Sequence, residues 1–385
     1  MKPSDPKPPA LTALRERIDG LDRQVLELLA KRMEVVAEVA AVKRTEGVQI
    51  RDYQRERQLL DDRRARAQEL GLAPAPIESI YRQIMLASRD YQASLGAAAP
   101  AQVEPRDVAV IGGEGEMGAL IARIFQDVGN RVRIADLGTE LTPLEAARSA
   151  DVVVISVPIG ATEDVIARLG PEVRPDALLM DVTSVKQAPL AAMLAATERS
   201  GASVVGAHPM FGPGVHSVQG QRMVLCRGRG DGAYDWVAGL LEARGLVVTE
   251  ADAAAHDRAM ALVQVLTHFQ TQVLGLSLAR VGIGLEETRR FTSPAYLMEL
   301  YIAARHFGQD PQLYGPIEML NPETPRVTAA FQAAARELSE ILERRDQAAF
   351  DQLFQEVRAY FGDFTAEATE QSSFLIDRLV ERSMG

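Results

Sequence analysis

The sequence predicts a multidomain protein: an all-α module, then an α/β Rossmann-type dinucleotide-binding domain, then an all-α C-terminal domain. Three observations predict this order. The segment from Leu11 to Gln92 has helical periodicity and no strong strand signal. Apolar strands alternate with helices from Val108 onward, and the strand signals fade after Ala253. At 385 residues the chain has room for two or three domains.

Changes in composition predict the boundaries. We expect a disordered tail over residues 1–10, a helical domain over 11–94, a linker over 95–106, a dinucleotide-binding domain over 107–252 and a helical domain over 253–385. The segment GLAPAP interrupts the first helical domain before its last helix, and ASLGAAAPAQVEPRD has the small, proline-containing composition of a linker.

Composition also excludes several classes of protein. The net charge of −11 argues against a general nucleic-acid binder, so an anionic substrate must be held by locally placed arginines. There is no apolar signal-peptide core and no membrane-spanning run, so we expect a cytoplasmic protein. The single cysteine, Cys226, lies in an apolar strand and is expected to be a buried, inert thiol. The five histidines show no metal-ligand spacing, so no metal site is predicted.

The central segment predicts a mostly parallel sheet covered by helices on both faces. The expected strands, in order, are VAVIG, RVRIAD, DVVVISVP, ALLMDV, SVVGAHP, RMVLCRG and LVVTEA.

A glycine turn follows the first of these strands and precedes a helix. Gly113, Gly115 and Gly118 form G-x-G-x-x-G, with Met117 in the same turn. The glycines allow a tight turn, close approach of a pyrophosphate and close helix–strand packing. Asp136 ends the second strand, where an acid bonds ribose hydroxyls and repels a 2′-phosphate. This pattern predicts NAD as the cofactor, although two arginines, Arg131 and Arg133, precede Asp136 nearby.

The first helix has a heptad seam, a row of apolar residues at alternating spacings of three and four. Its members are Leu11, Leu14, Ile18, Leu21, Val25, Leu28, Val35, Val39 and Val42. Arg32 occupies the seam position between Leu28 and Val35, where a charge is costly to bury without a partner. Lys43 lies on the same helical face, about 16 Å further along the axis, so the two cations could hold one small dianion between them.

Arg15 begins the same seam but is about 42 Å from Lys43 along a straight helix. It cannot reach a ligand held by Lys43 of its own chain. In a two-fold dimer of antiparallel helices, the partner's Arg15 could reach that ligand. The alternative for Arg15 and Lys43 is a solvated flank position on a coiled coil.

The segments LRERID, LLAKRMEVVAEVAAVK, IRDYQRER and SRDYQ resemble the all-helical chorismate mutases over essentially all of residues 11–92. The resemblance implies an intertwined homodimer that rearranges chorismate without proton transfer. It also implies roles for single residues. Arg15 of the partner chain, Arg32 and Lys43 would hold the substrate carboxylates, with Arg55 in support. Asp52 and Glu56 would meet the ring hydroxyl region. Ser88 and Gln92 would close the site, and Gln92 and Lys43 would bond the ether oxygen.

Candidate dehydrogenase residues follow three strands. Ser156 and Lys186 come after strand ends, where ligands bind in this fold. His208 is expected in a loop beside the cofactor crevice, where an imidazole can act as a base near neutral pH. From the residue alone, a structural histidine is the alternative.

The segments SVPI, DVTSVK, HPMFGP and QDPQLY resemble the prephenate dehydrogenases from about Val108 to the C-terminus. The resemblance implies that His208 accepts the proton of the C4 hydroxyl and that Ser156 orients that hydroxyl. Arg305 would pair with the ring carboxylate, His268 would lie near the substrate side chain, and Lys186 near the nicotinamide. The chain departs from some relatives at Leu297, where they carry an arginine.

Together the two resemblances imply a bifunctional enzyme of tyrosine biosynthesis that makes prephenate from chorismate and oxidises it with NAD. A homodimer and feedback inhibition by tyrosine are also implied, with no membrane or nucleic-acid partner. Two alternatives stay open at this stage. One is an arogenate dehydrogenase, and the other is a hydroxyacid dehydrogenase whose helical module only dimerises or senses.

Overall fold

The computed structural model describes residues 9–46, 50, 52–95 and 105–383. The chain forms two compact units. The first holds residues 1–157, 162–182 and 189–251, and the second holds residues 158–161, 183–188 and 252–385. Most of the expected tail and linker lies outside the described residues, although Pro9 and Ala10 already belong to the first helix.

Three helices form a helical module within the first unit: α1 Pro9–Glu46, α2 Tyr53–Glu69 and α3 Pro74–Ser94. Helix α2 begins where the Asp52 side chain accepts the backbone N–H of Arg55 at 2.9 Å, which caps an otherwise unpaired donor. Helix α3 begins with Pro74, at a position where the missing N–H of proline costs nothing. The GLAPAP segment therefore breaks the helical run as predicted.

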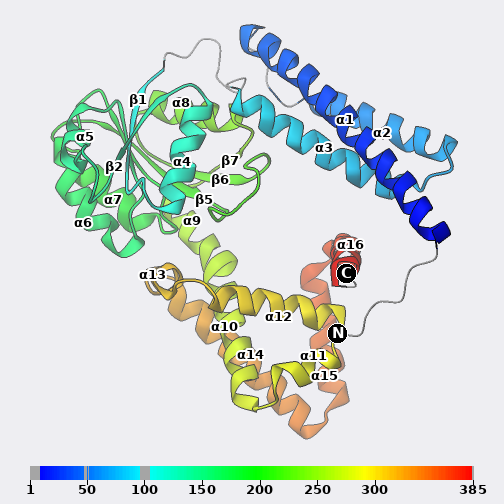
Figure 1. Ribbon diagram of the computed structural model, residues 1–385. Coiled ribbons are helices and arrows are strands. Elements are labelled where there is room, and N and C mark those ends of the chain that lie inside the picture. Colours follow the sequence, from blue (N-terminus) through cyan, green and yellow to red (C-terminus); the bar gives the residue numbers. More distant parts are fainter. Residues whose placement is uncertain (1–8, 47–49, 51, 96–104, 384–385) are drawn as a thin grey trace. The chain divides into compact units, whose positions relative to one another are not determined.

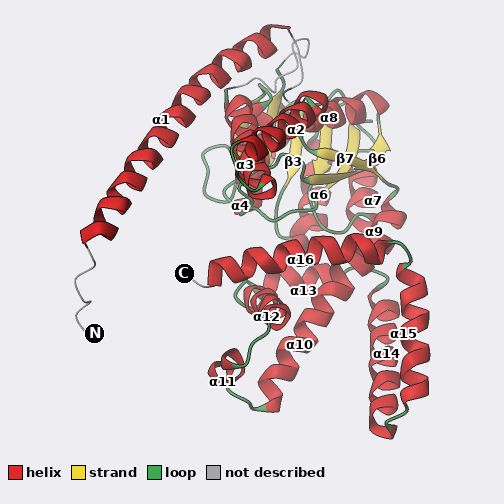
Figure 2. Ribbon diagram, turned by 90° about the vertical axis from the view of Figure 1, so that its right-hand side faces the viewer, coloured by secondary structure: helices red, strands yellow, loops and turns green. Residues whose placement is uncertain are grey.

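Helix α1 carries two apolar stripes. The stripe that packs inside the chain includes Val36 and Ala40, which are 8% and 2% exposed. The predicted heptad seam is the other stripe, and it is exposed: Leu14, Leu21 and Leu28 are 51%, 60% and 64% accessible. Figure 2 shows the N-terminal half of α1 standing clear of α2 and α3. The seam thus does not hold the module together within one chain, and it needs a partner surface.

The rest of the first unit is built around one sheet, whose seven described strands have the order β2-β1-β3-β4-β5-β6-β7. The strands are β1 Asp107–Ile111, β2 Arg131–Ala135, β3 Val152–Ile155, β4 Leu178–Asp181, β5 Ser203–Pro209, β6 Arg222–Arg229 and β7 Val247–Glu250. All neighbours are parallel except β5 and β6. The predicted, mostly parallel Rossmann-type sheet is confirmed, and the carboxyl ends of β1 to β5 share one edge.

Helices cover both faces of this sheet. They are α4 Glu116–Asp127, α5 Pro143–Ser149, α6 Thr162–Leu169, α7 Gln187–Ala196 and α8 Asp231–Ala243, with a short 3₁₀ turn, η2 Gly170–Glu172. Figure 1 shows α4 and α8 on one side and α5, α6 and α7 on the other. The central strands β3 and β4 are fully buried, whereas the edge strands β2 and β7 are partly exposed. Cys226 of β6 is buried, as expected.

His208 lies inside a strand and not in the loop that the sequence suggested. It is the penultimate residue of β5, pairs in register with Val224 of β6 and is 2% exposed. The strand has the bounds of the expected SVVGAHP, and its antiparallel pairing with β6 keeps His208 and Pro209 within it. This placement gives the imidazole a rigid backbone.

The second unit is helical. It contains η1 Ile159–Ala161, α9 Ala253–Met260, the π-helix η3 Ala261–Leu266, α10 Thr267–Val281, α11 Leu285–Arg290, α12 Pro294–Phe307, α13 Pro311–Met319, α14 Thr324–Arg344, α15 Gln347–Phe361 and α16 Phe364–Ser383. Figure 2 shows α14 and α15 side by side. In the part of the chain that is described, no helix has both the length and the apolar character needed to span a membrane.

The close packing of the glycine turn gives the first prediction. A Cβ at Gly118 would lie 2.3 Å from the carbonyl oxygen of Gly112 and 2.8 Å from the Cα of Gly113. Gly118→Ala should therefore lower the free energy of unfolding by about 1–3 kcal/mol in urea denaturation. Gly138→Ala is the matched control, because a Cβ there meets nothing within 4 Å. Equal stability of the two variants would contradict the packing argument.

Candidate functional site

A cavity of about 220 Å³ opens among the three helices of the helical module. Seven of the residues predicted for a mutase site line it: Arg32, Lys43, Asp52, Arg55, Glu56, Ser88 and Gln92. Arg15 is not among the lining residues of its own chain, in agreement with its distance of about 42 Å from Lys43 along α1.

Hydrogen bonds hold two of the cations at this cavity. The guanidinium of Arg32 donates to the hydroxyl oxygen of Ser88, which joins α1 to α3. The Ser88 hydroxyl in turn donates to the carbonyl oxygen of Ile84 at 2.6 Å. The ammonium of Lys43 donates to the carbonyl oxygen of Ile50, in the segment before α2. Each cation is therefore anchored by a neutral group and keeps its full charge for a ligand.

Burial lowers the pKa of Lys43 below its ordinary value of 10.5, because an ammonium loses hydration in the cavity. The carboxylates of Asp52 and Glu56 act in the opposite direction but do not offset the burial. The ammonium charge of Lys43 is therefore less stable than in water, and a bound anion would stabilise it.

Arg89 also lines the cavity, although it was not among the residues predicted from the sequence. Its guanidinium forms an ion pair with Glu56, and the side chains are 13% and 20% exposed. Its position, one residue after Ser88 in SRDYQ, was the available signal. The lining now includes four cations, Arg32, Lys43, Arg55 and Arg89, against two acids, Asp52 and Glu56. The cavity therefore has a formal charge of +2.

Gln92 adds a neutral polar group to this charged cavity. Its side-chain amide nitrogen donates to the carbonyl oxygen of Ser88 at 3.3 Å, and the residue is 7% exposed. Its amide oxygen is buried without a hydrogen-bond partner among the described residues. An amide does not titrate, so this group keeps the same donors at every pH.

The turn after β1 is built to let a ligand approach the backbone. Gly112 has a φ of +80°, and a Cβ there would lie 2.4 Å from the carbonyl oxygen of Ser156. The predicted cofactor residues were Gly113, Gly115, Met117 and Gly118, and Gly112 was not among them. The available signal for Gly112 was the pair of consecutive glycines at 112 and 113. Gly115 precedes α4, and no side chain caps this helix. Its first N–H groups are suited to a pyrophosphate.

Asp136 follows β2 at the same edge of the sheet. Its carboxylate accepts the backbone N–H of Glu114, in the glycine turn, at 3.1 Å. Arg133 is turned elsewhere, because it donates to Asp107 at 2.8 Å. Arg131 begins β2, about 16 Å from Asp136 at 3.3 Å per residue. Neither arginine is therefore placed to favour a 2′-phosphate, and the turn fits NAD.

Ser156 and His208 also lie at this carboxyl edge. Ser156 directly follows β3 and donates its backbone N–H to the carbonyl oxygen of Ile111 at 2.8 Å. His208 lies two residues beyond Gly206, which pairs with Asp181 at the end of β4. Strands β3 and β5 are parallel and flank β4, so they bring the two residues to one edge of the sheet.

The remaining predicted dehydrogenase residues belong to the second unit. Lys186 is fully buried, His268 lies on α10 and Arg305 on α12. The ring of His268 lies 5.5 Å from that of His306, the residue after Arg305. Burial and the neighbouring His306 lower the pKa of His268 to about 4, so it is neutral near pH 7.

Leu297, where some relatives have an arginine, lies on α12 and is 9% exposed. It contributes to the apolar packing of this unit. Leu297 itself therefore brings no charge to that position.

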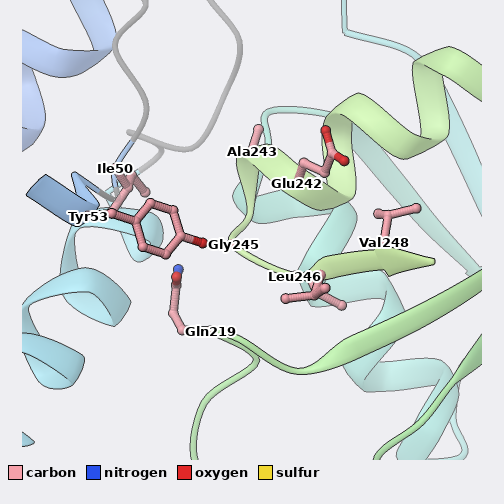
Figure 3. Close-up of a pocket in the computed structure, with 9 residues that line it drawn as sticks. Ile50, Tyr53, Gln219, Glu242, Ala243, Gly245, Leu246 and Val248 are labelled. Atoms are coloured by element: carbon pink, nitrogen blue, oxygen red, sulfur yellow. The ribbon is translucent and has the colours of Figure 1, made fainter.

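A second cavity of the first unit, about 270 Å³, lies where α2 begins and β7 begins (Figure 3). In Figure 3 the hydroxyl of Tyr53 points toward Gly245 and the amide of Gln219. Gln219 donates to the carbonyl oxygen of Arg244 at 2.9 Å. None of the predicted site residues lines this cavity.

Three family models match the chain. Residues 14–93 match chorismate mutase type II, residues 125–250 the nucleotide-binding domain of prephenate dehydrogenase, and residues 252–356 its dimerization domain. A T-protein of Enterobacter agglomerans is 38% identical over 366 residues, covering 95% of this chain and 97% of that protein. A T-protein of Haemophilus influenzae is 34% identical over 376 residues, covering 98% and 99%.

Among solved structures, the fold is similar to prephenate dehydrogenase from A. aeolicus in complex with hydroxyphenyl propionate and NAD+. The TM-score is 0.53 at 18% identity, covering 67% of this chain and 98% of that chain. A Synechocystis arogenate dehydrogenase gives a TM-score of 0.52 at 18% identity, over 66% of this chain and 98% of that one. At this identity the likeness concerns the fold alone.

Two T-proteins are 38% and 34% identical to this chain over nearly their full length, and three family models match it in order. The chain belongs to the T-protein family and is a bifunctional chorismate mutase and NAD-dependent prephenate dehydrogenase.

Proposed function

We propose that the three-helix cavity is the mutase site and that the carboxyl edge of the sheet provides the base and the cofactor site of the dehydrogenase. The observation that carries the first assignment is the formal charge of +2 among the residues lining a cavity of about 220 Å³. Chorismate carries two carboxylates, so the cavity matches its substrate in charge. The product prephenate then serves as substrate of the second reaction, which yields 4-hydroxyphenylpyruvate and carbon dioxide.

In the mutase cavity, Arg32 and Lys43 hold the substrate carboxylates, with Arg55 in support. Lys43 and Gln92 donate to the ether oxygen, where negative charge develops as the C–O bond breaks. Such fixed donors stabilise a transition state without having to reorganise. Ser88 orients Arg32, with which it is hydrogen-bonded. The rearrangement needs no general base, which agrees with a cavity rich in permanent donors.

The remaining two mutase residues, Asp52 and Glu56, face the ring hydroxyl of the substrate. Both line the cavity, and Glu56 is paired with Arg89. Carboxylates accept hydrogen bonds, so they suit a hydroxyl and would repel a misplaced carboxylate. We infer that they fix the orientation of the ring.

The mutase is proposed to act as a homodimer in which each cavity receives Arg15 from the partner subunit. The exposed seam of α1 supports this proposal, since a long apolar stripe in water is costly. The second unit offers another apolar surface. Phe354, Tyr360 and Phe364 on α15 and α16 are 54%, 82% and 55% exposed, and part of this unit matches a dimerization domain.

At the glycine turn, the backbone from Gly113 to Gly118, including Met117, would hold the pyrophosphate of NAD, and Asp136 its ribose. The close approach at Gly112 and the uncapped start of α4 support this fit. When bound there, NAD would supply the acceptor for the hydride that leaves C4 of prephenate. Lys186 is assigned to the nicotinamide end.

His208 is proposed to accept the proton of the C4 hydroxyl, and Ser156 to hold that hydroxyl in line. Arg305 pairs with the ring carboxylate, and the neutral His268 lies near the substrate side chain. A base within a rigid strand keeps a fixed direction, which proton transfer requires. Feedback inhibition by tyrosine, a cytoplasmic location and the domain boundaries given above stay predictions.

The pKa of Lys43 gives a test by pH. The mutase needs the ammonium form, and burial lowers the pKa at which that form is lost. The value of kcat/KM for chorismate should therefore fall with rising pH below the ordinary lysine value of 10.5. Lys43→Arg, which does not lose its charge in this range, should lack this alkaline limb. If kcat/KM of Lys43→Arg fell at the same alkaline pH as that of the wild type, the fall would belong to another group.

The shared mutase site can be tested by mixing two inactive chains. Arg15→Ala and Lys43→Ala should each abolish mutase activity in their own homodimers. After subunit exchange, a heterodimer would contain one cavity with both residues intact, so activity should return toward about a quarter of the wild-type level in an equal mixture. No recovery, despite exchange confirmed by native mass spectrometry, would mean that each site is built within one chain.

The role of His208 predicts a loss of turnover in the dehydrogenase alone. His208→Asn keeps the shape and removes the base, so kcat for prephenate should fall by roughly 10²–10⁴-fold. The acid limb of the pH profile should disappear as well. His268 cannot supply a limb near pH 6.5, since its pKa is about 4. Mutase activity should be unchanged in His208→Asn, which serves as the internal control. An unchanged acid limb in this variant would exclude His208 as the base.

A further inference from the structure

The carboxylate of Asp257 on α9 is 1% exposed and accepts four hydrogen bonds. One oxygen accepts the backbone N–H of Lys186 at 2.8 Å and the Nδ1–H of His256 at 2.8 Å. The other accepts the backbone N–H of Gln187 at 3.0 Å and its side-chain amide at 3.2 Å. All these residues belong to the second unit.

This carboxylate is ionised although it is buried. Burial acts to raise the pKa of Asp257, but the hydrogen bonds from His256, Gln187 and Lys186 outweigh it and leave the pKa below its ordinary value. The charge is thus maintained by donors that are fixed in place.

One backbone donor, Lys186, directly precedes α7, and the other, Gln187, is its first residue, about 70 residues earlier in the chain than Asp257. The first turn of α7 has no acidic residue of its own, so a side chain from another helix caps it. Asp257 is itself anchored, since the amide of Asn321, which is 3% exposed, donates to its backbone carbonyl at 2.8 Å. The backbone at Lys186 is therefore held by a carboxylate that is itself fixed in place.

Stability alone does not explain a charged group at this place. A buried charge is expensive to desolvate, and a neutral serine or asparagine caps a helix about as well. A carboxylate has two oxygens, and each accepts one of two consecutive backbone N–H groups. Together these bonds fix both the position and the direction of the backbone at Lys186 and Gln187. The Lys186 side chain is fully buried, so it cannot absorb a shift of its own backbone by moving through solvent.

We propose that Asp257 is a positioning residue of the dehydrogenase reaction, which holds Lys186 where the nicotinamide end of NAD binds. His256 completes the device by bonding the same carboxylate oxygen as Lys186. This inference rests on the role assigned to Lys186 in the proposed function.

The test compares Asp257→Asn with Asp252→Asn. Asp252 caps α9 itself by accepting the N–H of Ala255 at 2.8 Å, and asparagine is an equally good cap. In the protein without NAD, hydrogen exchange followed by mass spectrometry should accelerate in the peptide over residues 183–190 for Asp257→Asn only. Calorimetry should show weaker NAD binding for that variant only. The value of kcat for prephenate should fall by about 10²-fold, the scale expected for misplacement of a reacting group, while mutase activity is unchanged.

A double variant separates positioning from a general structural role. If Asp257 acts through Lys186, then Asp257→Asn combined with Lys186→Met should be no slower than Lys186→Met alone. Losses that multiply would overturn the proposal. Asp257→Glu keeps the charge but moves it by one methylene, so it should fold and still accelerate exchange over residues 183–190. Wild-type exchange and turnover in Asp257→Glu would also overturn it.

The same measurements distinguish failure of this inference from failure of the proposed function. Normal turnover in Lys186→Met would reject the role of Lys186 and this inference together, while leaving the other assigned residues standing. Absence of dehydrogenase activity in the unaltered chain would instead reject the proposed function.

Discussion

The mutase module depends on keeping positive charge inside a protein that is negative overall. The chain has a net charge of −11, yet the lining of the three-helix cavity contains four cations and two acids. Arg32 and Lys43 are held by a hydroxyl and a carbonyl, which fix a cation without neutralising it. Arg89 forms an ion pair with Glu56. The excess of two charges is what a dianionic substrate can neutralise.

The sheet domain solves a related problem with backbone groups. A cofactor pyrophosphate can be held by N–H groups if the chain turns sharply enough to expose them. The turn from Gly112 to Gly118 does so because its backbone segments approach more closely than any side chain would allow. Asp257 uses the opposite arrangement, in which a buried carboxylate satisfies the start of α7. The start of α4 thus has no side-chain cap and can meet a ligand, whereas the start of α7 is capped by a carboxylate of the protein.

Much of this could be predicted from the sequence, because periodicity and spacing report directly on local structure. The strands of the sheet, the break between α2 and α3 and the shared helical face of Arg32 and Lys43 follow from such patterns. The other predicted residues that line the three-helix cavity were implied by the family resemblance. The rest depends on contacts between distant segments. His208 lies in a strand because β6 pairs with it, and the inner stripe of α1 is defined by packing on the same chain. Arg89 and Asp257 function through partners 33 and about 70 residues away, which no local pattern reveals.

The central claim is that one chain carries both reactions in sequence. The most direct measurement supplies chorismate and NAD to the purified protein, with no added prephenate, and follows prephenate and NADH together. The account predicts that NADH forms after a short lag, as prephenate accumulates, and that 4-hydroxyphenylpyruvate appears in equal amount. NADH formation from added prephenate but none from chorismate would contradict it, because the helical module would then have no mutase activity.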